Sequence, residues 1–393
     1  MSTLTKPLLS NEERHAVIEL RHAMHREPEL SNHEWKTQAR IRQALEMFGL
    51  NNAKPFHETG LYIDIQGLAS GPSRSVALRG DIDALPIQEQ RDDLSYQSVL
   101  PGRMHACGHD MHTSIVFGTA LALHRMREDF SGRVRVFFQP AEEMEPVGGV
   151  TVLKEKLLDG FDAAVGLHIL PSIASGVYGA RPGAATKSAD QFDVIFNGLM
   201  AHGAMPYEGV DAIAIAAAFI NEVQKVVSRE FPSEDGPIIT IGTIRGGEAR
   251  NIICPSVLLT GTIRTASLVR RADLVRRVRE VAQGVAATHR GEAVFTSHLG
   301  DPPVVNDARM VALFRDLVVE TVGKTKFVEP PPLSGSDDFG YYSSCVPSIY
   351  FWFGSLEPGN ETGLHTPTFG ASDDLLVPTT ELSIRYCRLL LSQ

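Results

Sequence analysis

The apolar positions in the first half of the chain switch between the spacing of helices and that of strands. Two helices open the chain, and the pairs Ser10–Glu13 and Ser31–Glu34 predict a capping box at the start of each. Short apolar runs then alternate with longer segments of helical period, which predicts strands over 61–68, 75–80, 133–138 and 162–169 and helices over 112–126 and 150–158. This alternation predicts an α/β fold, with a mixed sheet covered by helices on both faces.

The pattern changes near Lys187 and changes back near Asp301. Between them the predicted order is β-α-β-β-α-β, with strands over 191–198, 238–247, 257–265 and 293–300 and helices over 211–227 and 268–285. That order is typical of a ferredoxin-like α+β unit. The earlier pattern then resumes, with a helix over 308–322, a strand over 348–354 and a final helix over 379–392. We therefore predict a discontinuous α/β domain, residues 1–187 and 301–393, interrupted by an inserted domain, residues 188–300.

The composition excludes several classes of protein. The 393 residues are 43% hydrophobic and 21% charged, so the chain has enough apolar material for sizeable cores. A formal net charge of −10 gives no electrostatic basis for binding nucleic acid or an anionic membrane. No segment reaches the roughly 20 apolar residues of a membrane span, and the glycine-rich nucleotide motifs are absent. The start of the chain lacks the apolar segment of a secretory signal, and the four cysteines form no CxxC pair, so we expect a reducing, cytoplasmic location.

Side chains suited to metal binding or acid–base chemistry follow three of the predicted strands. Asp81 and Asp83 follow the second strand, Glu142 and Glu143 the third, and His168 ends the fourth. In open α/β sheets, ligands bind beyond the carboxyl ends of the strands. Because neighbouring side chains point different ways, one of two adjacent glutamates can bind a metal while the other acts as a general base toward water. The alternative for such a pair is a solvated acidic loop.

The segment MHACGHDMHTS (104–114) holds the densest group of metal-binding side chains: Cys107, His109, Asp110 and His112. Thiolate and imidazole ligands suit zinc and the later first-row divalent metals, and carboxylates also suit manganese. Any one of these residues could instead cap the helix that follows. The whole group, together with the residues at the strand ends, favours a metal site. We expect Asp83 to orient a histidine ligand, the alternative being a turn residue in DIDALP.

A series of longer motifs, in order along nearly the whole chain, resembles the M20 family of metallopeptidases and amidohydrolases. The motifs are RGDIDALPI, MHACGHDMHTS, QPAEE, GLHILP, AHGAMPYEGVDAI, ARNIICP, GTIRT, SGSDDFGYY and LHTPTF. The resemblance is to the branch of hippurate hydrolases, N-acyl-amino-acid amidohydrolases, auxin-conjugate hydrolases and N-acetyl-diaminopimelate deacetylases. It implies a catalytic α/β domain with an inserted lid domain that mediates dimerisation, and two divalent metal ions per subunit, whether zinc, manganese, nickel or cobalt.

The resemblance also implies roles for individual residues. The metal ligands would be Cys107, His109, Glu143, His168 and His365. Glu142 would be the general base, and Asp83 would orient a ligand. His202 would reach the active site of the partner subunit and stabilise the oxyanion, and Asn251 and Arg264 would recognise the carboxylate of the substrate. The chain departs from the family pattern at Asp337, where relatives commonly have Glu, and at Cys254.

The function that follows is metal-dependent hydrolysis of the amide bond of a small N-acyl amino acid or amino-acid conjugate. The expected partners are this small molecule and a second copy of the chain in a homodimer, with further pairing to a tetramer left open. Three alternatives stay open: hydrolysis of another C–N bond at the same metal site, a thiol mechanism with Cys107 as nucleophile, and a non-catalytic relative that binds ligand.

Overall fold

The computed structural model of the protein describes residues 7–359 and 362–393, which divide into two compact units. The first unit contains the chain up to Gly183, together with Val305–Pro331 and Asp338–Gln393. The second unit contains Ala184–Val304 and Pro332–Asp337. Each unit has a hydrophobic core of its own. Among the described residues, no helix is both long and apolar enough to cross a membrane.

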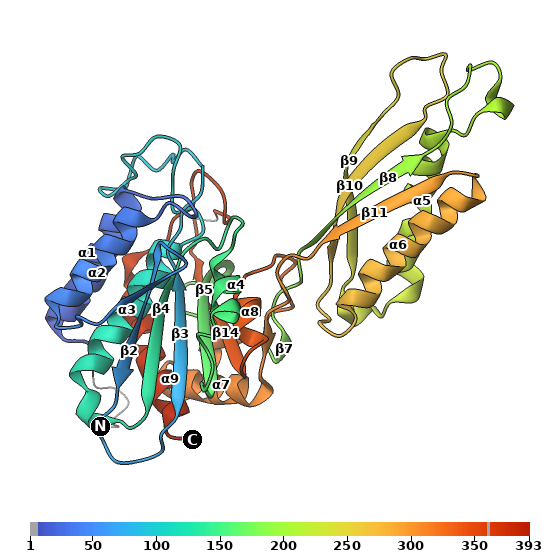
Figure 1. The fold of residues 1–393 in the computed structure, drawn as a ribbon. Helices are drawn as coiled ribbons and strands as arrows, with labels where there is room; N and C mark the ends of the chain where they lie inside the picture. Colours follow the sequence, from blue (N-terminus) through green and yellow to red (C-terminus); the bar gives the residue numbers. More distant parts are fainter. Residues whose placement is uncertain (1–6, 360–361) are drawn as a thin grey trace. The chain divides into compact units, whose positions relative to one another are not determined.

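The first unit is built on an eight-stranded mixed sheet in the order β1-β2-β4-β3-β5-β14-β6-β13 (Figure 1). The four central strands β4, β3, β5 and β14 run parallel to one another, and β2 is antiparallel to β4. The strands are β1 (Lys54–Phe56), β2 (Gly60–Gln66), β3 (Ser75–Asp81), β4 (Arg133–Gln139), β5 (Ala163–Ala174), β6 (Tyr178–Gly179), β13 (Phe327–Val328) and β14 (Ser348–Leu356). Two further short strands, β7 (Gly183–Ala184) and β12 (Val305–Asn306), form a separate two-stranded sheet.

Helices cover both faces of this sheet, which confirms the predicted α/β fold class. The register pairs Arg79 of β3 with Gly166 of β5, so these two residues face the same side of the sheet. Gly80, one residue further along β3, faces the opposite side. α3 packs against Gly80, and α8 packs against Gly166. α1 and α9 lie against α3, whereas α4 lies against α8. The helices are α1 (Asn11–Arg26), α2 (Trp35–Met47), α3 (His109–Arg125), α4 (Gly148–Lys154), α7 (Ala308–Thr321), α8 (Phe339–Ser343) and α9 (Leu376–Leu391).

The two predicted capping boxes have different outcomes. The box at α1 is confirmed, because the Ser10 side chain accepts from the Glu13 backbone and the Glu13 carboxylate accepts from the Ser10 backbone. The box at α2 is wrong. Glu34 is itself the residue that precedes α2, and its side chain makes no cap hydrogen bond to this helix. Ser31 and Glu34 instead make tertiary hydrogen bonds to the strand ends of the sheet.

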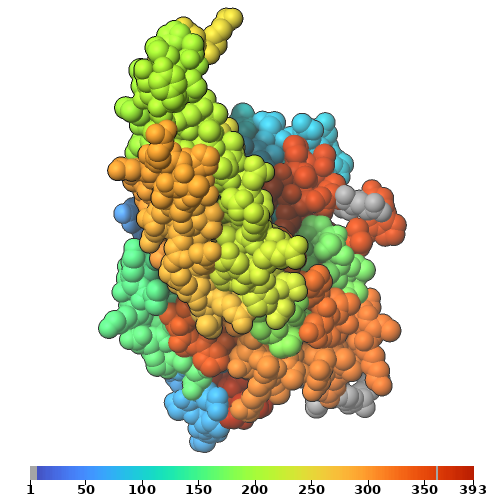
Figure 2. Space-filling view, turned by 90° about the vertical axis from the view of Figure 1, so that its right-hand side faces the viewer, coloured from blue at the N-terminus to red at the C-terminus, as the bar shows by residue number. Residues whose placement is uncertain are grey.

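The second unit has the predicted β-α-β-β-α-β order. Its strands form an antiparallel sheet in the order β11-β8-β10-β9, which is the arrangement of a ferredoxin-like unit. Alternate residues of β8 (Phe192, Val194 and Phe196) are buried against the helices, as a half-covered strand requires. Figure 2 shows α5 (yellow-green) and α6 (orange) side by side at the surface of this unit. The elements are β8 (Asp190–Asn197), α5 (Ala212–Lys225), β9 (Ile238–Gly246), β10 (Ser256–Arg264), α6 (Arg271–Thr288) and β11 (Glu292–His298).

Candidate metal centre

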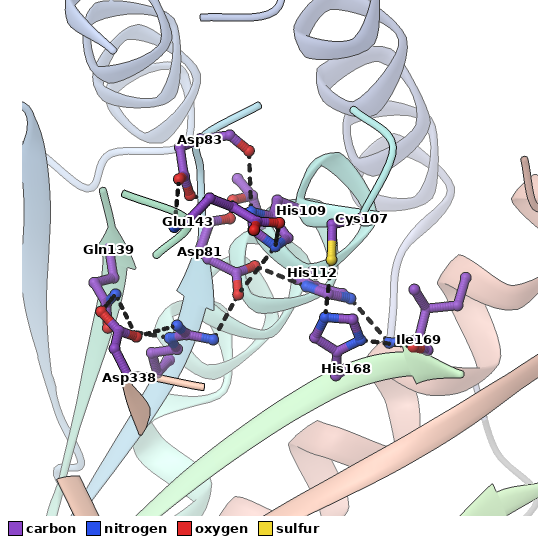
Figure 3. A network of polar contacts seen from close by, with 12 residues as sticks. Asp81, Asp83, Cys107, His109, His112, Gln139, Glu143, His168, Ile169 and Asp338 are labelled. Atoms are coloured by element: carbon purple, nitrogen blue, oxygen red, sulfur yellow. Dashed lines mark hydrogen bonds and ion pairs between the residues drawn. The ribbon is translucent and has the colours of Figure 1, made fainter. Parts of the chain in front are cut away.

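Residues from several segments of the first unit meet at one edge of its sheet (Figure 3). Because β3, β4 and β5 are parallel, their carboxyl ends lie at this edge together with the start of α3. The expectation that His168 ends its strand is wrong, since β5 runs on to Ala174. The described pairing of β5 with β3 stops at Gly166, however. His168 therefore lies in a stretch of β5 whose described pairing is with β14.

The side chain of Cys107 lies at the middle of this group. Its Sγ atom is 3.4 Å from Nε2 of His168 and 3.3 Å from Nε2 of His365. The same His365 nitrogen is 3.0 Å from Oε1 of Glu143, which in turn is 3.9 Å from Nε2 of His109. The structure thus brings together all five residues for which the resemblance implies metal ligation, in overlapping sets whose donor atoms lie within 4.8 Å of one another.

Several of these donor atoms are held ready for a cation. Nδ1 of His109 donates to the carboxylate of Asp83 at 3.1 Å and to its carbonyl at 3.0 Å. The other nitrogen of His109, Nε2, is buried and has no hydrogen-bond partner among the described residues. A buried polar atom left unpaired costs about 1–3 kcal/mol. A metal ion at Nε2 would remove that cost, so the residues present fit the metal site that the family resemblance implies.

The imidazole of His168 is oriented in the same way. Its Nδ1 donates to the carbonyl of Ile169 at 2.6 Å, so the lone pair of Nε2 points at the sulfur of Cys107. His365 has a φ of +60°, a left-handed conformation that is rare for a residue with a side chain. Its backbone N–H donates to the carbonyl of Ala106 at 2.8 Å, which ties this distant segment to the loop that carries Cys107.

Glycine is needed at the position between Cys107 and His109. Gly108 precedes α3 with a φ of +83°, and a Cβ atom there would lie 2.6 Å from Cγ2 of Ile169. Both the backbone conformation and the space therefore exclude a larger residue. The tight turn that results points Cys107 and His109 toward the same group of donors.

The charges of the site suit a bound cation. Burial alone would raise the pKa of Asp81 and of Asp83, but Arg79 beside Asp81 and His109 beside Asp83 hold both pKa values below their usual range. Burial lowers the pKa of His109, yet the facing carboxylates, that of Asp81 first, raise it to about 10. The surroundings therefore favour positive charge at this imidazole, and a metal ion would supply that charge in place of a proton.

The surroundings of Cys107 disfavour the charged form of its side chain, unlike those of His109. Burial first, and then the negative charge of Glu143, raise the pKa of the Cys107 thiol well above the usual range. Its protein surroundings therefore disfavour a free thiolate, which is the form that attacks as a nucleophile. A metal ion would reverse this balance, because a coordinating thiol loses its proton. These contacts favour a ligand role for Cys107 over the thiol mechanism.

The four residues of the cluster in segment 104–114 differ in their contacts. His112 donates from Nδ1 to Asp81 at 2.7 Å, and its Nε2 accepts from the backbone N–H of Ile169 at 2.9 Å. Both nitrogens are thus engaged in holding the loop. Asp110 points away to α1, where its carboxylate contacts Arg21 and His25. Of the dense cluster, Cys107 and His109 are the two residues whose donor atoms join the ligand sets around Glu143.

A buried polar network around Arg79 contacts the site residue Asp81, and it was not predicted from the sequence. Arg79 is completely buried and binds Asp81, Gln139 and Asp338. The sequence did offer one signal for Arg79, which is a charge within an otherwise apolar strand, SVALRGD. Gln139 and Asp338 lie within the motifs QPAEE and SGSDDFGYY, but the motifs alone do not indicate a shared contact with Arg79.

A second buried network ties α1 to the start of α3. Both nitrogens of His25 face carboxylates, Nδ1 at 2.9 Å from Asp110 and Nε2 at 3.0 Å from Glu89. Burial lowers the pKa of His25, but the hydrogen bonds to Asp110 and Glu89 outweigh it and raise the pKa to about 9. Arg21 also contacts Asp110, so two cations hold this carboxylate next to His109.

We expect the stability of the protein to depend on the charge of His25. A folded-state pKa of about 9, raised from 6.5, means that the stabilisation is complete below pH 6.5 and is lost as the pH rises through 9. The loss is on the order of 3 kcal/mol. Urea unfolding of the wild type and of His25→Gln between pH 6 and pH 9.5 would measure it. The difference in unfolding free energy between the two proteins should shrink across this range, and a constant difference would contradict the assignment.

The second unit holds the remaining predicted site residues, and it brings two of the three together. His202 forms a β-bridge with Ile252, and Gly203 N–H donates to the carbonyl of Asn251 at 2.8 Å. Ala204 N–H donates to Nδ1 of His202 at 3.1 Å. In the neutral imidazole the proton then lies on Nε2, which leaves Nε2–H as a hydrogen-bond donor.

Arg264 lies at the far end of β10 from His202 and Asn251. These two residues extend the β8–β10 ladder beyond Ser256, whereas Arg264 is the last residue of β10. At about 3.3 Å per residue, the strand alone separates the two ends by about 26 Å. A single chain therefore does not bring Asn251 and Arg264 to one substrate carboxylate. Of the two departures from the family pattern, Cys254 is buried and its thiol donates to the carbonyl of Ser256, and Asp337 is buried.

A largely buried group of thiol, imidazole and carboxylate donors, with a second carboxylate beside it, is typical of a metal-dependent hydrolase. The chain belongs to peptidase family M20/M25/M40, whose sequence pattern matches residues 77–388. This confirms the family resemblance of the motifs and makes the protein an amidohydrolase-type enzyme of that family.

Similar proteins cover almost the whole chain. An uncharacterized hydrolase, y4tI, of Sinorhizobium fredii is 64% identical over 98% of this chain and 96% of its own length. N-acetyl-L-cysteine deacetylase of Bacillus subtilis is 35% identical over 96% of this chain and 86% of its own. The IAA-amino acid hydrolase ILR1-like 2 of Arabidopsis thaliana is 33% identical over 92% and 82%.

The fold is also that of a solved structure. The YXEP protein of Bacillus subtilis, described as a dinuclear metal binding peptidase from the M20 family, is 29% identical to this chain. The two structures superpose with a TM-score of 0.85, over 97% of this chain and 99% of that one.

Proposed function

We propose that this enzyme hydrolyses the amide bond of small N-acyl amino acids or amino-acid conjugates, releasing a carboxylic acid and a free amino acid. The observation that carries the proposal is the pair Glu142 and Glu143 beside the buried donors: each offers a carboxylate oxygen within 4.8 Å of the other and of His109. The similarity to a deacetylase of N-acetyl-L-cysteine and to a hydrolase of IAA-amino acids supports this class of substrate.

We assign the two divalent metal ions of the proposed site to Cys107, His109, Glu143, His168 and His365. This mixture of thiol, imidazole and carboxylate ligands is compatible with zinc, manganese, nickel and cobalt. When bound, such metals polarise a scissile carbonyl and make an attacking water more acidic. Asp83 keeps His109 in the orientation and tautomer that a ligand needs.

The chain's own residues would supply the proton transfers. Glu142 takes a proton from the attacking water and delivers it to the leaving nitrogen, so that the amine departs neutral. His202 donates from Nε2–H to the oxyanion that forms as the carbonyl is attacked. Asn251, which the structure places next to His202, and Arg264 are proposed to contact the carboxylate of the substrate.

The separation of Asn251 and Arg264 along β10 bears on the oligomeric state. If both residues contact one substrate, they come from different copies of the chain, because one copy holds them about 26 Å apart. We therefore propose a homodimer in which each active site takes residues from both chains. All four cysteines are free thiols, which supports a reducing, cytoplasmic location.

A panel of substrates tests this proposal. Purified protein would be supplied with zinc, manganese, nickel or cobalt and incubated with N-acetyl and N-benzoyl amino acids, an indole-acetyl amino acid and N-acetyl-diaminopimelate. We expect release of the free amino acid from at least one of them. If protein shown to hold two metal ions releases no amino acid from any of these substrates, the proposal is contradicted. That result would favour hydrolysis of another C–N bond or a ligand-binding role.

A further inference from the structure

The turn that precedes α2 runs along the edge of the sheet where the site residues gather. Leu30 forms a parallel β-bridge with Ala84, and Ala84 N–H donates to the carbonyl of Glu29 at 2.8 Å. These backbone contacts fix the turn to the segment that follows β3. Its side chains at residues 31 and 34 are thereby directed at two different strand ends.

Ser31 makes the first contact. Its hydroxyl donates to Oδ2 of Asp83 at 2.6 Å, and the same oxygen accepts from the backbone N–H of Glu143 at 3.1 Å. The other oxygen of Asp83 faces His109. Ser31 is buried, so this carboxylate is held in place without competition from water.

Glu34 makes the second contact. Its side chain is completely buried, and its two oxygens accept one hydrogen bond each: Oε1 from the backbone N–H of Ala141 at 2.8 Å, and Oε2 from the hydroxyl of Thr59 at 2.7 Å. Ala141 has a φ of +52°, the left-handed conformation that residues with a side chain rarely adopt. Such a conformation costs about 1–3 kcal/mol and persists only where the surrounding contacts impose it. Ala141 directly precedes Glu142 and Glu143.

We propose that Ser31 and Glu34 are positioning residues of the active site: Glu34 holds Ala141 in its left-handed conformation and so aims Glu142 and Glu143, while Ser31 fixes the Asp83 carboxylate that orients His109. This inference rests on the proposed function for the roles of Glu142 and Glu143. It assigns a task in the metal centre to a turn that is 107 residues away from Ala141 in sequence.

The electrostatics of Glu34 predict which substitution is tolerated. Burial first, and then the negative charge of Asp83, raise the pKa of Glu34 to about 7. The acid and the carboxylate both keep an oxygen that accepts from Ala141 N–H, and the hydroxyl of Thr59 can donate or accept. Glutamine offers the same shape and the same carbonyl oxygen. Glu34→Gln should therefore keep the position of Ala141, whereas Glu34→Ala should lose it.

The test compares Glu34→Ala, Glu34→Gln and a matched control, Glu29→Ala. Glu29 is a buried acid of the same turn that also accepts two hydrogen bonds, from the backbone and the hydroxyl of Thr37, but its carboxylate bonds to α2 rather than to a strand end. Two quantities would be measured: the zinc affinity of the metal-free protein by competition with a chelating dye, and kcat and KM on the best substrate of the panel.

We expect Glu34→Ala to weaken zinc binding about 10–100-fold, the range found when residues that orient metal ligands are removed. Its kcat should fall about 100-fold, because misplacing a catalytic group by about 1 Å costs that much, while KM stays within about twofold. Glu34→Gln and Glu29→Ala should stay within about threefold of the wild type in both quantities.

Wild-type zinc affinity and turnover in folded Glu34→Ala would overturn the inference, as would equal losses in the Glu29→Ala control. If Glu34→Ala does not fold, Ser31→Ala tests the other contact of the turn, with an expected loss of about 10-fold in zinc affinity and with wild-type affinity as the contradicting result. The zinc series does not depend on a substrate. A wild type that hydrolyses nothing therefore contradicts the proposed function alone, and the zinc affinities of the variants then still test the positioning role.

Discussion

Glu142→Gln should lower kcat by about 10²–10⁴-fold, the usual contribution of general acid–base catalysis, while the protein still binds two metal ions. Glutamine has the shape of glutamate but cannot take a proton from water. The measurement is kcat on the best substrate of the panel, with metal content determined on the same samples. The nearby Glu145→Gln is the control, because Glu145 is exposed and accepts one local hydrogen bond, from Val147 N–H; it should keep wild-type turnover.

Turnover within a few-fold of the wild type in Glu142→Gln would show that another group takes the proton. A loss of metal together with activity would instead place Glu142 among the ligands, where its distance to His109 and Glu143 also permits it.

His202→Ala should lower kcat by about 10²–10³-fold, the cost of removing one donor to a developing oxyanion. The hydrogen bond from Ala204 N–H presents Nε2–H of His202 as that donor. His298→Ala is the control, since His298 is an exposed histidine of the same unit, on β11. Metal content and thermal unfolding should match the wild type in both variants, and equal turnover in the two would contradict the role of His202.

Co-expressing His202→Ala with Glu142→Gln extends this test to the dimer. If His202 serves the partner's site, a mixed dimer holds one intact site, and random pairing restores about one quarter of the wild-type activity. If His202 serves its own chain, every site in the mixture is defective. Activity no higher than that of the single variants would contradict the proposed exchange of residues between subunits.

The fold and the site residues that follow the strands could be predicted because they depend on regular patterns, whereas the ligand role of His365 came from the family resemblance alone. Periodicity identified the central strands, and the carboxyl ends of parallel strands meet at one edge, so Asp83, Glu142 and Glu143 had to lie near one another. The β-α-β-β-α-β order likewise determined the arrangement of the second unit.

Contacts between distant segments could not be predicted in this way. The pair Ser31–Glu34 has the local pattern of a capping box, but Asp83 and Ala141 provide better buried partners, and only the tertiary structure reveals them. His112 has the same residue type and neighbourhood as His109, and it differs because Ile169 N–H occupies one of its nitrogens.

The position of Arg264 shows a limit of a different kind. The motifs ARNIICP and GTIRT both belong to the inserted unit, which suggested a shared task for Asn251 and Arg264. One strand, β10, runs between them, so the same sequence also implied that they lie at its opposite ends.

The most direct test of the central claim is the dependence of turnover on metal. The protein would be freed of metal with a chelator, and zinc, manganese, nickel or cobalt would be added back in steps while release of free amino acid from the best substrate is measured. We predict no turnover after chelation and full recovery as about two metal ions bind per chain. Undiminished turnover in the metal-free protein, abolished by alkylation of its thiols, would contradict the account and favour Cys107 as a nucleophile.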